Sequence, residues 1–324
     1  MPRRVKDQFT GTISAYVKDL QNLIDEKPHR RETIERANEF LDELSKVTAH
    51  MDLQGSGPSE KAKKDLLGEA AYAEHTSAKF IFLGHLTERM RHSRINLYIA
   101  AKGGLLMRYI ERYLTAKAVQ WVHFNETGPN AVTRKNSELF IFLIPSERHH
   151  NTQNLHWPEP DAIIAFDETF SLDRITNFHR NTSPPPIIRL IIHNTQEHVD
   201  LCVPRMLDPF QRLLQIVWVT LQAQRRIVPR LEPSPSVCAD YIAPYVQSHA
   251  MKRPDRGWPL PPIPPIDGVS VLLHSDSSQL ETPFDMDGTD GPLRFWPNPQ
   301  LPQAQSPSVQ AGSQQPGKRQ FVSC

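Results

Sequence analysis

The segment from Asp161 to Glu168 contains the residues best suited to chemistry. It reads Asp-Ala-Ile-Ile-Ala-Phe-Asp-Glu, an apolar strand that ends in two carboxylates. In phosphate-cleaving ATPases a strand of this kind holds Mg²⁺, but a glycine-rich loop with Lys and Ser or Thr must also cradle the phosphates. Lys102-Gly103-Gly104 has neither the spacing nor the hydroxyl of such a loop. We therefore expect Asp167 and Glu168 to form a degenerate acidic strand end, and the chain not to be an enzyme.

Histidines and cysteines offer two further candidates. His149, His150 and His156 gather in a polar stretch, yet zinc sites favour tightly paired ligands and no cysteine lies nearby. His198 and Cys202 would share a helix face, and a thiol beside an imidazole could act as a nucleophile. The sequence supplies neither an orienting third group nor an oxyanion site for that pair. We predict no catalytic residue, no metal and no cofactor.

Basic residues form three clusters. The candidate contacts to DNA phosphates are Arg89, Arg91, Arg94, Arg174 and Arg180, and another basic cluster surrounds Arg225 and Arg226. Most protein–DNA hydrogen bonds go to the backbone, so these arginines could bind phosphate. They could equally be solvated helix ends favoured by the helix dipole. The sequence leaves both readings open.

Composition restricts the class of protein. The chain has 324 residues, with 37 Lys and Arg against 36 Asp and Glu, so its net charge of +1 argues against an extensively basic nucleic-acid-binding surface. Its three cysteines are widely spaced and indicate neither a disulfide framework nor a zinc motif. No apolar run is long enough for a membrane-spanning helix, so we expect no membrane association.

The elements that would position these residues follow from hydrophobic periodicity. Apolar residues recur at helical spacing over 13–24, 34–51 and 59–91, with a break at Gln54–Pro58. Short apolar runs typical of strands buried on both faces lie at 95–101, 118–124, 139–144, 162–166 and 187–192. Helical patterns at 105–114, 208–228 and 237–251 separate or follow them. The pattern predicts an α/β fold with a parallel sheet of about five strands in a three-layer domain.

The chain divides into three parts by composition. We predict an N-terminal helical segment over 1–54, an α/β domain over 59–253 and a disordered tail over 254–324. More than half of the 29 prolines lie after Val228, and the tail has too little apolar surface to offset the entropy of ordering. Within the tail, the run Trp258–Ile266 must be extended because proline fixes φ. It could dock on an SH3-like or WW-like groove, or serve as a stiff linker.

An ordered set of segments resembles the second lobe of Snf2-type chromatin-remodelling helicases. The segments are Ser77–Leu86, Ile95–Leu106, Pro160–Phe170 and Ile187–His198. With Trp218, Glu197-His198 and Leu201-Cys202, the set more specifically resembles subunits 2 and 3 of the fungal class II histone deacetylase complex. The resemblance covers about 52–228.

The resemblance implies a RecA/helicase-lobe-2-like domain that has lost its motor. It further implies a non-catalytic, nuclear chromatin adaptor in transcriptional silencing. The implied partners are a separate class II histone deacetylase catalytic subunit, a sister accessory subunit, and DNA or nucleosomes. His179-Arg180 only approximates the late arginine motif of remodellers, and Pro-rich sequence after Pro254 replaces the expected coiled coil. Two alternatives remain: a protein-interaction scaffold without nucleic-acid binding, and a residual nucleotide-dependent enzyme centred on Asp167 and Glu168.

Overall fold

A parallel sheet forms the centre of the protein. The computed structural model describes residues 2–25, 31–54, 65–124, 138–147, 150–151, 158–170, 175–176, 185–227, 233–251, 257–266 and 320–323. Within them, six strands are ordered β2-β3-β1-β5-β7-β8. They are β1 (Asn96–Ala101), β2 (Gln120–His123), β3 (Phe140–Pro145), β5 (Ala162–Ala165), β7 (Ile187–Ile191) and β8 (Gln320–Ser323). Every neighbouring pair is parallel, which confirms the predicted fold class and the five predicted strands.

The sheet is buried on both faces because its central strands are continuously apolar. Ile99 of β1 lies between Leu143 of β3 and Ile164 of β5, and all three are fully buried. The helix α5 (Leu105–Ala116) makes the connection from β1 to β2, as a parallel crossover requires. Since all strands run the same way, their carboxyl ends meet at one edge of the sheet.

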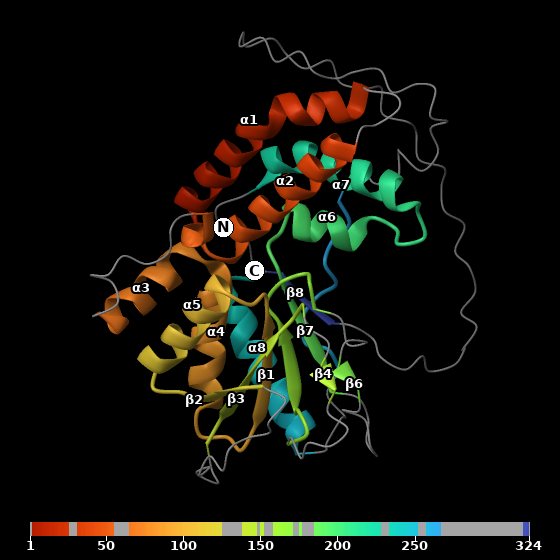
Figure 1. Cartoon of the computed structure of the whole chain (residues 1–324). Coiled ribbons are helices and arrows are strands. Elements are labelled where there is room, and N and C mark those ends of the chain that lie inside the picture. Colours follow the sequence, from red (N-terminus) through yellow and green to blue (C-terminus); the bar gives the residue numbers. More distant parts are fainter. Residues whose placement is uncertain are drawn as a thin grey trace, which may run out of the picture.

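Helices cover one face of the sheet. α4 (Ala78–Met90), α5 and α8 (Pro235–Ala250) lie against it, with α3 (Leu66–Thr76) beside α4 and α5 (Figure 1). The predicted helical region 59–91 is interrupted at Ser77, which is extended (φ −139°, ψ 120°) and ends α3 before α4 begins. The Ser77 hydroxyl donates a 2.8 Å hydrogen bond to the Ala49 carbonyl, so this break is tied to the N-terminal helices.

Aromatic residues dominate the opposite face. Tyr98 stacks on Phe142 with ring centroids 4.5 Å apart, and Phe124 and Phe170 are buried in the same cluster. The Tyr98 hydroxyl donates to the Pro158 carbonyl at 2.7 Å, which holds the segment before β5 against this face. A two-stranded parallel sheet of β4 (His150–Asn151) and β6 (Ile175–Thr176) also belongs to the chain.

The remaining helices gather at the carboxyl end of the sheet (Figure 1). They are α1 (Arg3–Asp25), α2 (Arg31–Ala49), η1 (Met51–Gln54), α6 (Gln196–Cys202), α7 (Pro209–Ala223) and η4 (Gln224–Arg226). Phe9 of α1 and Phe40 of α2 are fully buried in a hydrophobic core that also contains Ile99 and Ile164 of the sheet. The N-terminal helices therefore share a core with the α/β domain.

Two stretches of the tail have described positions. Residues 257–266 form neither helix nor strand and bury Leu260 and Ile266, and β8 pairs with β7 from Ile188↔Gln320 to Ile191↔Ser323. Neither the packing of 257–266 nor the strand β8 was expected, because proline-rich and polar composition argues against both. The rest of the tail, 267–319, lies outside the described residues. None of the described helices is long and apolar enough to cross a membrane.

Candidate functional site

Asp167 braces the loops at the carboxyl end of the sheet. It follows β5 and accepts hydrogen bonds from the backbone N–H of Lys102, from the backbone N–H of Thr169 at 2.9 Å, and from the Ser146 hydroxyl at 3.2 Å. These donors come after β1, β5 and β3, respectively. The Thr169 hydroxyl donates to it as well. A carboxylate with these protein donors is already satisfied, so Asp167 is placed to join neighbouring loops.

The loop between β1 and α5 also binds a second carboxylate, which belongs to Glu147. Gly103 N–H donates to both carboxylate oxygens of Glu147 at 2.9 Å. Backbone N–H groups before a helix are the usual receptors for phosphate. Here an incoming phosphate would have to displace Glu147 and would face the negative charge of Asp167. The loop therefore opposes nucleotide binding as it stands.

A fully buried ion pair lies beneath these loops. Lys79 of α4 and Glu197 of α6 are 2.5 Å apart, and their side chains are 0% and 3% exposed. Lys79 also donates to the Phe166 carbonyl at 2.7 Å, while Glu197 accepts from the Ile192 N–H at 3.0 Å. The pair thus connects α4, α6 and the ends of β5 and β7.

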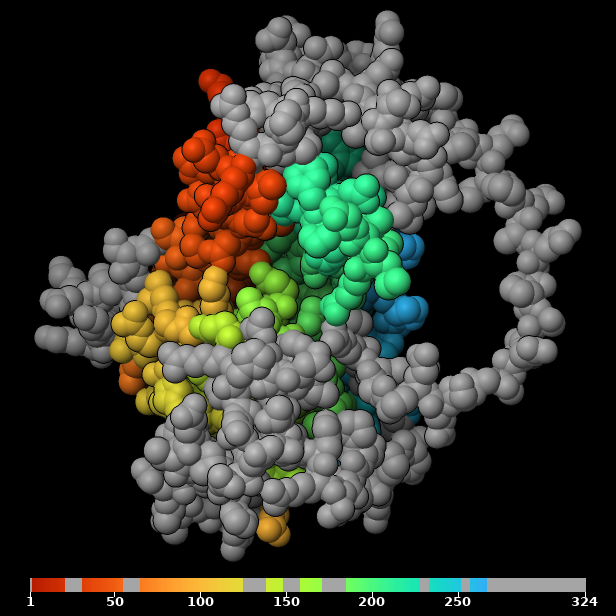
Figure 2. Space-filling view, turned by 45° about the vertical axis from the view of Figure 1, so that its right-hand side comes forward, coloured from red at the N-terminus to blue at the C-terminus, as the bar shows by residue number. Residues whose placement is uncertain are grey.

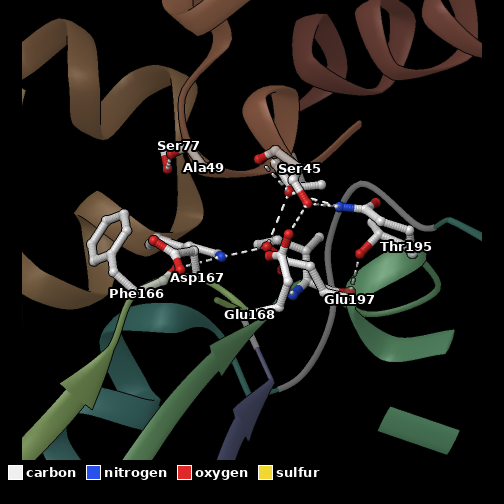
Figure 3. Close-up of polar contacts among 12 residues, drawn as sticks. Ser45, Ala49, Ser77, Phe166, Asp167, Glu168, Thr195 and Glu197 are labelled. Carbon is white, nitrogen blue, oxygen red and sulfur yellow. Dashed lines mark hydrogen bonds and ion pairs between the residues drawn. The ribbon is translucent and has the colours of Figure 1, made fainter. Parts of the chain in front are cut away.

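Helix α2 closes this polar cluster from above (Figure 3). The Ser45 hydroxyl donates to Glu168, and the Thr48 hydroxyl donates to Glu197 at 3.1 Å. Gln196 reaches the Thr48 hydroxyl at 3.2 Å. These bonds cross more than a hundred residues of sequence, so the cluster fixes the N-terminal helices on the sheet.

Glu168 is enclosed by the protein and lies near two other carboxylates. Burial raises the pKa of Glu168 to about 7, and the negative charges of Glu197 and Asp167 add to the effect. Its Oε2 is inaccessible and has no hydrogen-bond partner among the described residues. The side chain also lines a hollow of about 320 Å³ between α2, α6 and α7.

We expect Glu168→Gln to stabilise the protein at alkaline pH. The folded pKa of about 7 exceeds the ordinary 4.5, so the parent loses stability as pH rises between these values and the loss is complete above pH 7. The amide carries no charge to desolvate and keeps an acceptor for Ser45. The variant should gain about 3 kcal/mol on the parent between pH 4 and pH 8.

Urea unfolding at both pH values measures this gain. Glu159→Gln, a substitution of an exposed carboxylate, is the matched control and should show no comparable gain. A stability difference that stays constant with pH in Glu168→Gln would contradict the assignment.

His198 and Cys202 do lie on one helix, α6, but they do not form a nucleophile. His198 Nδ1 accepts from the Asn194 N–H at 3.2 Å, and Nε2 lies 2.9 Å from the Pro264 carbonyl. Both ring nitrogens are therefore engaged. Burial raises the pKa of the Cys202 thiol, which disfavours the reactive thiolate.

The candidate phosphate contacts differ in their surroundings. Arg89 pairs with Asp240 at 2.7 Å, and Arg91 pairs with Glu88 at 2.9 Å while it also donates to the Lys117 carbonyl. Arg94 is exposed just before β1. Arg174 and Arg180 lie outside the described residues. The structure thus supplies protein partners for two of the three arginines that it places.

No cluster of three His, Cys, Asp or Glu side chains able to hold a metal occurs in the described part of the chain. Of the three loop histidines, His149 and His156 lie outside that part. His150 begins β4, which pairs with β6.

Sequence reasoning missed the ion pair at the centre of the cluster. Its signal was a single lysine in the apolar segment Ala78-Lys-Phe-Ile-Phe-Leu83, since a lysine on a buried helix face requires a partner. Glu197 gave no such signal.

Residues 1–234 match the model of class II histone deacetylase complex subunits 2 and 3. The chain belongs to this family. The family match spans the N-terminal helices and the sheet through β7, and it ends just before α8.

Solved structures resemble this family member in fold. A chain from structural and functional studies of the yeast class II Hda1 HDAC complex is 19% identical with a TM-score of 0.66, covering 82% of this chain and 92% of that one. A chain from the crystal structure of fission yeast Ccq1 and Tpz1 is 17% identical with a TM-score of 0.60, covering 83% and 95%. A Sulfolobus solfataricus SWI2/SNF2 ATPase core in complex with dsDNA reaches only 0.46 at 12% identity, covering 70% and 48%, which is too slight to bear on the fold. Curated protein sequences give no match.

Proposed function

We propose that this subunit is a non-catalytic chromatin adaptor that supports a separate class II histone deacetylase catalytic subunit. The observation that carries the proposal is the family match over residues 1–234. We further propose that the adaptor acts in the nucleus, together with a sister accessory subunit, in transcriptional silencing.

The loop between β1 and α5, where a nucleotide phosphate would have to bind, supports the non-catalytic part of the proposal. Glu147 accepts both of its hydrogen bonds from Gly103 N–H, and Asp167 accepts from Lys102 N–H. These carboxylates occupy donors that a nucleotide would need. A nucleotide-dependent enzyme would require saturable ATP binding that Asp167→Asn abolishes, and equilibrium dialysis of the purified chain should detect no saturable binding.

An activity assay on the purified protein distinguishes an adaptor from an enzyme. The chain is tagged in its native cells, purified gently and assayed for deacetylase activity, while the same chain made alone in bacteria is assayed in parallel. Activity that co-elutes with a distinct catalytic subunit, and is absent from the recombinant chain, is the expected result. An inactive native eluate would refute the adaptor function.

We also propose that the adaptor touches DNA or nucleosomes, with Arg89, Arg91, Arg94, Arg174 and Arg180 as candidate contacts. Arg94→Glu is the sharpest single test, because Arg89 and Arg91 already have acidic partners. Losing one phosphate contact should weaken binding to any DNA sequence by roughly fivefold at 0.15 M salt and reduce the salt slope by about one.

Fluorescence anisotropy over a range of salt concentrations measures both quantities. Arg31→Glu is the matched control, since Arg31 is exposed on α2 and its reversal changes the net charge equally. Equal losses in the two variants would mean that net charge alone matters. Arg174→Glu and Arg180→Glu belong in the same series.

A scaffold without nucleic-acid binding is the second candidate function. It is favoured by the ion pairs of Arg89 and Arg91 and by a net charge of only +1. Tight and salt-sensitive binding of the parent chain to DNA would exclude it.

A further inference from the structure

The proline-rich segment 257–266 is fastened to the domain surface. Ile266 packs in a cluster with Val199 of α6 and Ile216 of α7, and the ring of Trp258 meets Tyr245 of α8 edge-on with centroids 5.4 Å apart. The Pro264 carbonyl lies 2.9 Å from His198 Nε2. These contacts engage its two ends, and the segment is visible in blue at the surface in Figure 2.

Burial along this segment has a period of three. Leu260 and Ile266 are 8% and 7% exposed, and Ile263 is half-buried between them. The residues that face solvent are Pro261, Pro262, Pro264 and Pro265. This period matches a polyproline II helix, which has three residues per turn. In such a helix one edge would be buried and the other two would present the prolines.

We propose that residues 261–265 form a docking ridge for a partner domain with an aromatic-lined groove, of the kind found in SH3 and WW domains. Such grooves accept successive pairs of residues that end in proline, while every third residue points away. Pro261-Pro262 and Pro264-Pro265 are two such pairs, and Ile263 between them is half-buried.

The packing favours a docking ridge over a stiff linker. A linker needs no contact along its length, whereas this segment buries one apolar edge and leaves the proline edges free. Fastening both ends removes conformational freedom before a partner arrives, which lowers the entropic cost of binding. The proposal goes beyond the adaptor function and does not depend on it.

Binding to purified domains tests the ridge. The full chain is titrated against a panel of isolated SH3 and WW domains by fluorescence anisotropy. At least one domain should bind, and Pro262→Ala/Pro265→Ala should weaken that binding by at least about tenfold. Because both prolines are exposed, the variant should unfold at the same temperature as the parent.

A second proline pair provides the matched control. Pro299 and Pro302 have the same spacing elsewhere in the tail, and Pro299→Ala/Pro302→Ala should leave the affinity unchanged. Two outcomes would overturn the proposal: no domain of the panel binds the parent, or binding persists in Pro262→Ala/Pro265→Ala.

Discussion

Lys79→Met is expected to lower the free energy of unfolding by about 3–5 kcal/mol. The methionine fills a similar volume but leaves Glu197, which is 3% exposed, as a buried charge without its cation. It also removes the donor to the Phe166 carbonyl. Because the ion pair joins α4 to α6 at the carboxyl end of the sheet, urea denaturation should show one transition at a lower midpoint.

Two further variants give this prediction its controls. Lys79→Met/Glu197→Gln should recover more than half of the loss, because the neutral amide retains an acceptor for the Ile192 N–H. Lys117→Met breaks a partly exposed ion pair with Glu74 at 2.7 Å, and should cost only about 0–1 kcal/mol. Equal losses of unfolding free energy in Lys79→Met and Lys117→Met would show that burial of the charge does not increase the cost of removing its partner.

His50 should lower the stability of the protein as the pH falls. His50 is fully buried, with its ring stacked on Tyr109 at 4.2 Å. Burial lowers the pKa of His50 from 6.5 to about 4, against the opposing charges of Asp52 and Glu69. His198 behaves alike, since burial lowers its pKa to about 4 as well.

The sign of the effect follows from these values. Above pH 6.5 His50 is neutral in both states and costs nothing. As the pH falls toward 4, the unfolded chain takes up a proton that the folded chain refuses, so stability is lost progressively. Each such histidine contributes a slope of about 1.4 kcal/mol per pH unit in this window.

His50→Gln isolates that share. It should flatten the dependence of the unfolding free energy on pH by about 1.4 kcal/mol per unit between pH 4.5 and pH 6. Urea titrations across this window measure the slope, and Glu168 is unchanged in both proteins and cancels. His92→Gln, at an exposed histidine, is the control and should keep the parent slope. An unaltered slope in His50→Gln would refute the assignment.

The strands could be predicted from the sequence because they are short apolar runs with burial on both faces. Leu97–Ala101 and Phe140–Ile144 have no polar residue to interrupt the pattern. The break at Ser77 could not be placed, because no Gly or Pro marks it and the stabilising contact is with Ala49. Local patterns report local structure, and this break depends on a distant helix.

In the candidate site, too, local sequence indicates the strand, whereas the contacts depend on distant residues. Asp167 and Glu168 follow β5 in the sequence, yet their partners Ser45 and Ser146 come from other parts of the chain. Lys79 and Glu197 are separated by 118 positions, and Arg89 and Asp240 by 151. Neither pairing leaves a trace in residue spacing. The proline edge of 261–265 was visible in the sequence, but which of its faces is buried depends on α6, α7 and α8.

β8 can pair with β7 only long after β7 itself has been synthesised. The outer edge of β7 is paired by residues 320–323, which the ribosome delivers more than a hundred residues after β7 itself. Until they emerge, the row of N–H and C=O groups on that edge has no β8 to pair with. An unpaired edge of this kind is a template for the strands of neighbouring nascent chains. Pairing with residues 320–323 of the same chain ends this exposure once they have emerged.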